Sequence, residues 1–255
     1  MNYYVPKNLL SKNNNKTIKG EKYGWITYIL YLAPFNQNDK GKNICSHASK
    51  GCVESCLFGS GFGGMFSDVE KGRVNKTNFL LSARKDFLNK VYNEISSLVK
   101  KHEKKKEKVC IRLNGTSDLS WEKFKLKDGK SLMELFPDVQ FYDYTKNYLR
   151  FNRVLPSNYH LTFSRSENNE EHVERILAMG HNVAIVFDEL PKTYKGYKVI
   201  NGDLSDLRFK DEKNVVVGLK YKKMTGKGAD NNKAFESGFA LRIEDLGELV
   251  VKLAA

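Results

Sequence analysis

Short runs of β-branched and aromatic residues recur along the chain and alternate with helical or polar segments. The first run, residues 25–33 (WITYILYLA), ends at Pro34. Strands that alternate with helices are typical of a parallel sheet with right-handed crossovers. The sequence therefore predicts an α/β fold. The later runs are residues 109–113, 139–144, 159–163, 183–187 and 215–219, with residues 197–200 as a short additional strand.

The number of these repeats decides between two α/β architectures. About six or seven strand–helix units fall short of the eight that a complete barrel needs. We therefore expect a partial or distorted (β/α) barrel with mostly parallel strands, and an open doubly wound sheet is the alternative. The longest helical periodicity covers residues 78–106, and shorter helices fit residues 130–136, 148–154 and 170–179. Gly180 is placed to end the last of these helices.

Composition along the chain suggests three parts. Residues 1–20 are rich in Asn and Lys and are expected to form a polar arm. Residues 21–225 hold the barrel-like domain, and residues 226–255 form a tail with a short helix at 243–253. Inside the domain, residues 35–69 form a loop rich in cysteine and glycine. Loops of that length within a domain are generally functional.

The chain is strongly basic, which bears on its partners. Lys and Arg number 43 against 30 Asp and Glu, giving a net charge of +13 over 255 residues. Such an excess raises affinity for polyanions, so we predict a nucleotide or nucleic-acid partner. The alternative is a lysine-rich composition carried by solvated surface, as at residues 100–108. The sequence has no apolar run of the roughly 18 residues that a membrane helix needs, and no apolar signal core at its start, so we expect a cytoplasmic protein.

The cysteine loop is the sharpest chemical feature. Cys45, Cys52 and Cys56 follow a C-x6-C-x3-C spacing. In a cytosolic protein such clustering favours metal binding or catalysis over disulfides. Thiolates suit zinc or an iron–sulfur cluster, and a structural zinc would take His47 as the nearest fourth ligand. Unligated thiols or a disulfide remain open. The glycine run at residues 59–64 could serve as a lid or a phosphate cradle.

Polar side chains follow the predicted strands, where chemistry gathers in parallel α/β folds. Asp118 follows the second strand, Asp143 lies at the end of the third, and Lys146 comes three residues later. A pair formed by Asp143 and Lys146 would shift the pKa of both groups, and an aspartate there could act as base or nucleophile. We take Asp118, Asp143 and Lys146 as candidate catalytic residues. Ordinary turns are the alternative for any single one. Two further residues, Cys110 and Trp121, are predicted to pack in the interior.

Several long motifs carry a resemblance to a known family. They are LYLAP, ASKGC-x3-CL, RLNGTSDLSWE, FPDVQFYDYTK and NYHLTFSRSE, and the resemblance covers roughly residues 9–223. These motifs resemble a family of uncharacterised proteins found mainly in bacteriophages and related mobile elements. The resemblance implies the cytoplasm of a bacterial host as the location, and it implies no particular activity.

The chain is also distantly similar to the radical S-adenosylmethionine enzymes, which combine a partial (β/α) barrel with a three-cysteine loop after the first strand. That similarity implies a 4Fe-4S cluster on Cys45, Cys52 and Cys56, with one iron open to S-adenosylmethionine. The usual spacing in that superfamily is C-x3-C-x2-C, from which this chain departs. The expected cofactor-binding residues are Asn114, Gly115 and Thr116, in place of the superfamily's glycine-rich segment, with Ser164, Arg165 and Asp188 at later strand ends.

Three function hypotheses follow. The first is a redox enzyme that cleaves S-adenosylmethionine and abstracts hydrogen from a nucleotide or nucleic-acid substrate. The second is a non-redox base-modifying enzyme, similar to a transglycosylase or glycosylase, with Asp118 and Asp143 as base and nucleophile and with structural zinc on the cysteines. The third is a non-catalytic protein that binds a nucleotide or a host protein.

Overall fold

The computed structural model describes residues 3–12, 15–56, 67–224 and 230–247. The chain divides into two compact units, and it passes between them more than once. Strands β4 and β5 have residues in both units. The first unit comprises Met1–Ser46, Ser67–Asp143 and Arg153–Leu161, and the second comprises His47–Phe66, Tyr144–Asn152 and Thr162–Ala255.

The first unit contains a sheet with the strand order β1-β2-β3-β4-β5. Strand β1 pairs with β2 antiparallel, whereas β2 pairs with β3 and β3 with β4 in parallel. The strands are β1 (Leu10–Ser11), β2 (Trp25–Leu30), β3 (Lys108–Arg112), β4 (Gln140–Thr145) and β5 (Tyr159–Ser164). The helices are α1 (Asn15–Glu21), α4 (Ser67–Ser82), α5 (Arg84–Glu103) and α6 (Leu132–Leu135), with 3-10 turns η2 (Trp121–Lys123) and η3 (Lys127–Gly129).

Helix α5 forms because its apolar residues recur on one face. Phe87, Leu88, Val91 and Ile95 are all buried, at the spacing that places them along one side of a helix. The strand β3 that follows is buried over its central residues, Val109–Ile111. Cys110 is fully buried and lies 3.2 Å from the Thr27 hydroxyl, which confirms the prediction of an interior cysteine.

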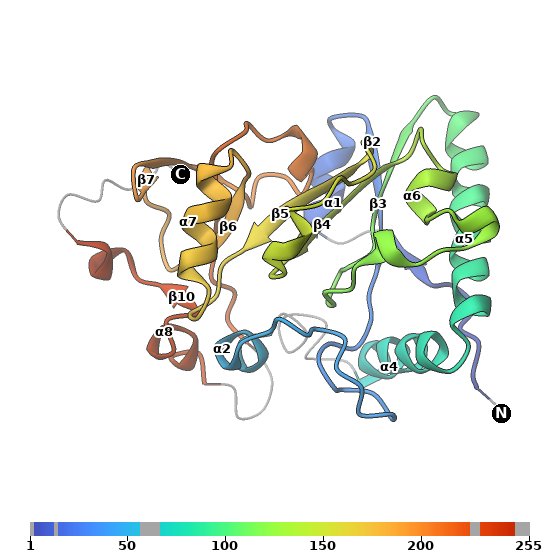
Figure 1. Cartoon of the computed structure of the whole chain (residues 1–255), viewed down its shortest axis with the longest axis horizontal. Helices are drawn as coiled ribbons and strands as arrows, with labels where there is room; N and C mark the ends of the chain where they lie inside the picture. Colours follow the sequence, from blue (N-terminus) through green and yellow to red (C-terminus); the bar gives the residue numbers. More distant parts are fainter. Residues whose placement is uncertain (1–2, 13–14, 57–66, 225–229, 248–255) are drawn as a thin grey trace. The chain divides into compact units, whose positions relative to one another are not determined.

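The predicted helix over residues 78–106 is wrong in its extent. Two helices, α4 and α5, meet at a sharp bend (Figure 1), because Ala83 has non-helical backbone angles (φ −143°, ψ 63°). The bend brings the rings of Phe79 and Phe87 to 5.4 Å from each other. In a straight helix two residues eight apart are separated by about 12 Å along the axis, so burying both rings together requires the break. No proline or glycine marks it in the sequence.

The second unit contains strands in the order β5-β6-β9-β8-β7, of which β5, β6, β9 and β8 pair in parallel. Strand β6 pairs along one edge with all of β9, and its other edge is shared by β5 at the start and β10 at the end. Strands β7 and β8 form an antiparallel hairpin. The strands are β6 (Val183–Phe187), β7 (Thr193–Tyr194), β8 (Tyr197–Asn201), β9 (Val216–Lys220) and β10 (Ala240–Leu241). The helices are α2 (Lys50–Glu54), α7 (Glu170–Ala178) and α8 (Lys233–Glu236), with 3-10 turns η4 (Tyr148–Arg150), η5 (Arg208–Lys210) and η6 (Ile243–Leu246).

The core of this unit lies between α7 and the sheet, where α7 lies beside β6 (Figure 1). Val173, Ile176 and Leu177 of α7 pack in one cluster with Phe163 and Ile185 from the strands. The helix ends as predicted at Gly180, whose positive φ of 82° allows its N–H to bond the Leu177 carbonyl.

The predicted α/β class with mostly parallel strands is confirmed, and the partial barrel stays a prediction. Most of the expected strands appear within one or two residues of their predicted bounds, although β2 ends at Leu30 rather than residue 33. The glycine run at residues 59–64 and the end of the predicted tail helix lie outside the described residues. Within the described ranges, no helix combines the length and the apolar character that crossing a membrane requires.

Candidate functional site

Cys45, the first cysteine of the loop, is held in the first unit by residues that follow two strands. Its half-buried sulfur receives the backbone N–H of Phe35, which follows β2, at 3.3 Å. The thiol in turn lies 3.8 Å from the carbonyl oxygen of Thr116, which follows β3. The side chain of Asn43 accepts from the Cys45 N–H at 2.7 Å. Cys45 is therefore fixed at the carboxyl ends of β2 and β3.

The loop after β3 is organised around the side chain of Asn114, which is 2% exposed. Its Oδ1 accepts from the Ser117 hydroxyl at 2.9 Å, from the Leu119 N–H at 3.0 Å and from Trp121 Nε1 at 3.0 Å. Its Nδ2 donates to the Leu119 carbonyl at 2.9 Å. A buried amide that satisfies so many partners rigidifies the loop. Trp121 is fully buried, which confirms its predicted packing role.

Gly115 is required by the close approach of this loop to β2. Its N–H donates to the Leu30 carbonyl at 3.0 Å. A Cβ at this position would lie 2.6 Å from the Tyr31 ring, 2.7 Å from Ile29 and 2.8 Å from the Leu30 oxygen. The glycine thus serves backbone packing in this unit, and this packing supplies a structural reason for the NGTSD motif.

The remaining polar residues of the motif attach the loop to the chain that follows β2. The Thr116 hydroxyl donates to the Leu32 carbonyl. The Asp118 N–H donates to the carbonyl of Ile44, the neighbour of Cys45, at 3.1 Å. Asp118 is half-buried, so it can still reach a ligand. The structure therefore brings Asp118 and Cys45 into one region of the first unit.

Asp143 lies beneath this loop and is fully buried. One carboxylate oxygen accepts from the backbone N–H of Asn114 and the other from the Tyr159 hydroxyl, both at 2.7 Å. A buried carboxylate needs such partners to offset its lost hydration. In this geometry Asp143 ties the loop after β3 to β5, which is a positioning role; a role as base or nucleophile stays a prediction.

In the second unit, helix α2 carries Cys52. Ser49 caps the helix, since its hydroxyl accepts from the Cys52 N–H at 3.2 Å. The same hydroxyl donates to Glu167 at 2.6 Å, and the Gly51 N–H donates to the other Glu167 oxygen at 2.7 Å. Glu167 follows β5, so one carboxylate from a strand end holds the start of the cysteine helix. Cys56 is half-buried and comes two residues after the helix ends.

Gly51 allows this helix to pack closely. A Cβ there would lie 2.7 Å from the Ser237 hydroxyl, 2.9 Å from Phe239 Cβ and 3.0 Å from the Glu167 carboxyl carbon. The contact joins α2 to the segment after α8. Glu167 is not among the site residues expected from the sequence. The S-K-G-C run predicts a capped helix, but nothing local indicates a partner 116 to 118 residues away.

Arg165 belongs to an ion-pair network of the second unit. Its Nε donates to Glu170 at 2.7 Å, and its Nη1 donates to the Gly238 carbonyl at 2.7 Å. Glu170 also accepts from the Tyr194 hydroxyl and from Lys195. Burial raises the pKa of Glu170, but hydrogen bonds from Lys195, Tyr194 and Arg165 outweigh burial and hold the pKa below its ordinary value. Burial is the largest cause that raises the pKa of Tyr194, and its hydrogen bond to Glu170 is the next; together they bring the pKa to about 12.

The other predicted residues of this unit have separate contacts. Lys146 donates to the Ser164 hydroxyl at 3.0 Å, and its ammonium lies 5.6 Å from the centre of the Phe239 ring. Asp188 accepts from the backbone N–H of Ile243 at 2.9 Å, so it fastens the chain after β10. Lys146, Ser164 and Arg165 thus lie around the end of β5, while Asp188 has a distinct attachment.

All four cysteines are free thiols, so the disulfide alternative finds no support. The described ranges contain no group of three or more His, Cys, Asp or Glu side chains arranged to hold a metal ion. The metal centre predicted for Cys45, Cys52 and Cys56 stays a prediction. Its donor set of half-buried thiols has the softness that zinc and iron–sulfur clusters favour.

Comparison with known proteins identifies a family. The family model described as gene product 88 matches residues 8–240 of the chain. No curated protein and no solved structure matches it. The match covers most of the sequence and confirms the expected family of phage type. The chain belongs to the gene product 88 family.

Proposed function

We propose that this protein is a metal enzyme whose thiol loop binds an iron–sulfur cluster and which acts on a nucleotide or nucleic-acid substrate. The observation that supports this most is how the loop is attached. In the first unit, Phe35 and Thr116 contact Cys45 from the ends of β2 and β3. In the second, Glu167 at the end of β5 holds the helix that carries Cys52. Strand ends are where parallel α/β enzymes place their chemistry.

The thiols suit this role in chemistry as well. Cys45, Cys52 and Cys56 form no disulfide and are half-buried, and three thiolates leave one iron of a four-iron cluster open to a ligand. A bound cluster of this kind supplies the one-electron chemistry that cleaves S-adenosylmethionine. The proposal includes a partial (β/α) barrel as the scaffold.

The chain's own residues would bind and orient the reactants. The rigid loop around Asn114 presents the half-buried Asp118 carboxylate, which can accept from a hydroxyl or amino group of a ligand. Asp143 fixes the start of that loop through its bond to the Asn114 N–H. Lys146, held by Ser164, adds a positive charge beyond the end of β4.

Metal analysis tests the proposal. Protein purified without oxygen should be brown and contain about four irons and four sulfides per chain. Replacing Cys45, Cys52 or Cys56 singly by Ala should remove most of the iron. Cys110→Ala is the matched control, because Cys110 lies buried in β3 beside Thr27, and this variant should keep its iron. Colourless protein without iron would overturn the proposal.

The same analysis separates the alternatives. One zinc per chain, lost on replacing the same cysteines, would favour the non-redox base-modifying enzyme with Asp118 and Asp143 as base and nucleophile. Against that alternative, both oxygens of Asp143 already accept hydrogen bonds inside the protein. Protein without any metal would favour the non-catalytic binder.

A further inference from the structure

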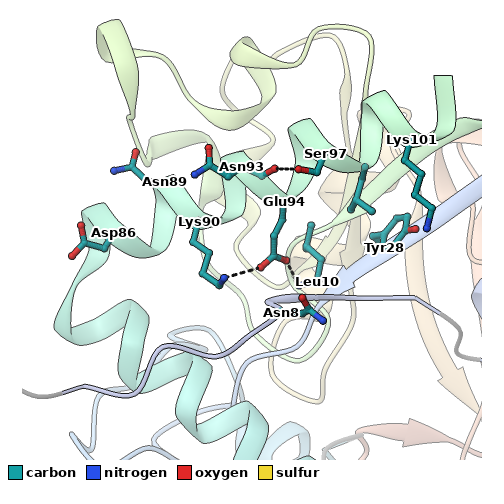
Figure 2. Close-up of a pocket in the computed structure, with 11 residues that line it drawn as sticks. Asn8, Leu10, Tyr28, Asp86, Asn89, Lys90, Asn93, Glu94, Ser97 and Lys101 are labelled. Atoms are coloured by element: carbon teal, nitrogen blue, oxygen red, sulfur yellow. Dashed lines mark hydrogen bonds and ion pairs between the residues drawn. The ribbon is translucent and has the colours of Figure 1, made fainter. Parts of the chain in front are cut away.

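A pocket of about 690 Å³ lies in the first unit, apart from the thiol loop. Helix α5 forms one wall, residues Asn8 and Leu10 of the N-terminal segment form the opposite edge, and Tyr28 of β2 closes one end (Figure 2). Most of the lining residues carry polar side chains, among them asparagine, serine and lysine residues of α5. None of these residues belongs to the site described above.

The N-terminal edge of the pocket is fixed by two charged side chains. The Glu94 carboxylate accepts from the backbone N–H groups of Leu9 and Leu10, at 2.9 to 3.0 Å. Lys76 donates to the Leu9 carbonyl at 2.7 Å, and burial lowers the pKa of this lysine. Two half-buried charged side chains therefore hold this short segment in place, so this edge of the pocket is preformed.

A hydrogen-bonded relay fixes the hydroxyl of Tyr28. The hydroxyl lies 2.9 Å from Nε2 of the buried His102, and Nδ1 of His102 lies 2.7 Å from Glu107. The hydrogen bond from His102 lowers the pKa of Glu107, so this carboxylate is ionised and can only accept. In the neutral imidazole Nδ1 therefore carries the proton, Nε2 accepts, and Tyr28 donates. What Tyr28 can offer to a ligand is then a lone pair.

The lysines of the pocket supply positive charge, since its two acidic groups are engaged. Glu94 holds the N-terminal segment, and Asp86 accepts from the Tyr3 hydroxyl at 2.8 Å. Lys90 lies 3.6 Å from Glu94, and Lys101 has no hydrogen-bond or ion-pair partner within the described ranges. A ligand that satisfies this pocket needs an anionic group for Lys101 and a hydroxyl or amino donor for Tyr28.

We propose that this pocket binds a nucleotide unit, with its phosphate at Lys101 and a sugar hydroxyl or base amino group donating to Tyr28. A nucleotide carries both groups within one small molecule, either free or as part of a single strand. The asparagine amides of α5 can pair with the edge of a base. This site does not depend on metal at the thiol loop.

Fluorescence anisotropy with a labelled ten-nucleotide single strand of mixed sequence, at low salt, tests the proposal. Lys101→Gln should weaken binding about tenfold and reduce the slope of log affinity against log salt by about 0.7, the value for one phosphate contact. Lys100→Gln is the matched control, because it removes the same charge from the neighbouring position of α5 outside the pocket. Equal losses in the two variants would mean general attraction by surface charge and would overturn the site.

A second variant tests the other half of the ligand. Tyr28→Phe should weaken binding about fivefold, the loss of one hydrogen bond, without changing the salt slope. An unchanged affinity in a folded Tyr28→Phe protein would overturn the role given to this hydroxyl. Competition by unlabelled dAMP would identify a free nucleotide as the ligand, and competition only by oligonucleotides would identify a strand. If the labelled strand did not bind the wild-type protein at low salt, the proposal as a whole would be overturned.

The variant in which all three loop cysteines are Ala separates this site from the proposed function. It should lose metal and keep the full affinity for the probe. Binding that disappears together with the metal would place the nucleotide at the thiol loop and contradict the pocket.

Discussion

The two attachments of the thiol loop differ in how far apart in sequence their partners lie. In the first unit, the loop after β3 is largely satisfied by itself, with the Asn114 side chain accepting from residues three, five and seven positions later. In the second unit, helix α2 has five residues and is held by Glu167, more than a hundred residues away. The loop that Cys45 contacts is thus ordered by its own residues, whereas α2, which carries Cys52, is held by contacts from Glu167, Ser237 and Phe239, far along the chain.

The largest expected effect on stability concerns Asp143, which holds the start of the loop after β3. Asp143→Ala would leave the Asn114 N–H and the Tyr159 hydroxyl without their acceptor in a buried site, and should lower the free energy of unfolding by about 3 kcal/mol. Urea denaturation measures this change. Asp118→Ala, at the half-buried end of the same loop, should cost under about 0.5 kcal/mol. Similar losses in the two variants would show that Asp143 does not support the loop.

The second unit should also show a pH dependence of stability, which comes from one carboxyl group. Burial raises the pKa of Asp211 to about 6, although Arg208 at 3.3 Å opposes the shift, while Asp206 and Glu212 add to it. A carboxyl group whose folded pKa is raised binds its proton more tightly when folded. Stability therefore falls as pH rises from about 4 through about 6, by about 2 kcal/mol once partial exposure is allowed for.

Comparing the wild type with Asp211→Asn isolates this effect. The free energy of unfolding of the variant, relative to wild type, should increase by about 2 kcal/mol between pH 4 and pH 7. Urea denaturation at a series of pH values measures the difference. A difference that stays constant across this range would contradict the assignment of Asp211 as the titrating group.

Two glycine substitutions sharpen the comparison between the attachments. Gly115→Ala places a Cβ against the backbone oxygen of Leu30, which cannot move aside, and should cost about 2 kcal/mol. Gly51→Ala meets side-chain atoms of Ser237 and Phe239, and the added helix propensity offsets part of the strain, so about 1 kcal/mol is expected. Thermal denaturation of both variants ranks them. The reverse order would show that α2 is the more tightly constrained region.

Glu167→Ala should affect global stability less than Asp143→Ala or Gly115→Ala does. Losing this carboxylate frees the start of α2, with a cost of about 1 kcal/mol. Because the helix is short, its opening is local, and the clearest signal is about tenfold faster alkylation of Cys52 with unchanged alkylation of Cys45. Glu171→Ala, an exposed residue of α7, is the control. Equal acceleration at both cysteines would mean that the two attachments are not independent.

Sequence patterns predicted the parts of the fold that depend on local composition. The apolar runs gave the strands within a few residues, and the polar residues that follow them include Asp118 and Asp143 of the first-unit site. The break at Ala83 was not predicted, because it accompanies the packing of Phe79 on Phe87 and has no local sequence signal. The burial of Asp143 beneath Asn114 likewise follows from the pairing of strands and not from either motif.

Polar contacts between residues far apart in the sequence could not be predicted. Glu167 joins Ser49 across 118 positions, and Tyr28 joins His102 across 74. Each residue by itself looks like an ordinary surface or core residue. The function of such residues appears only when the fold brings their partners together.

The most direct test of the central claim is the iron and acid-labile sulfide content of protein purified without oxygen, measured beside its Cys52→Ala variant. Our account predicts about four of each per chain in the wild type and little in the variant. Wild-type protein with no more iron than the variant would contradict it.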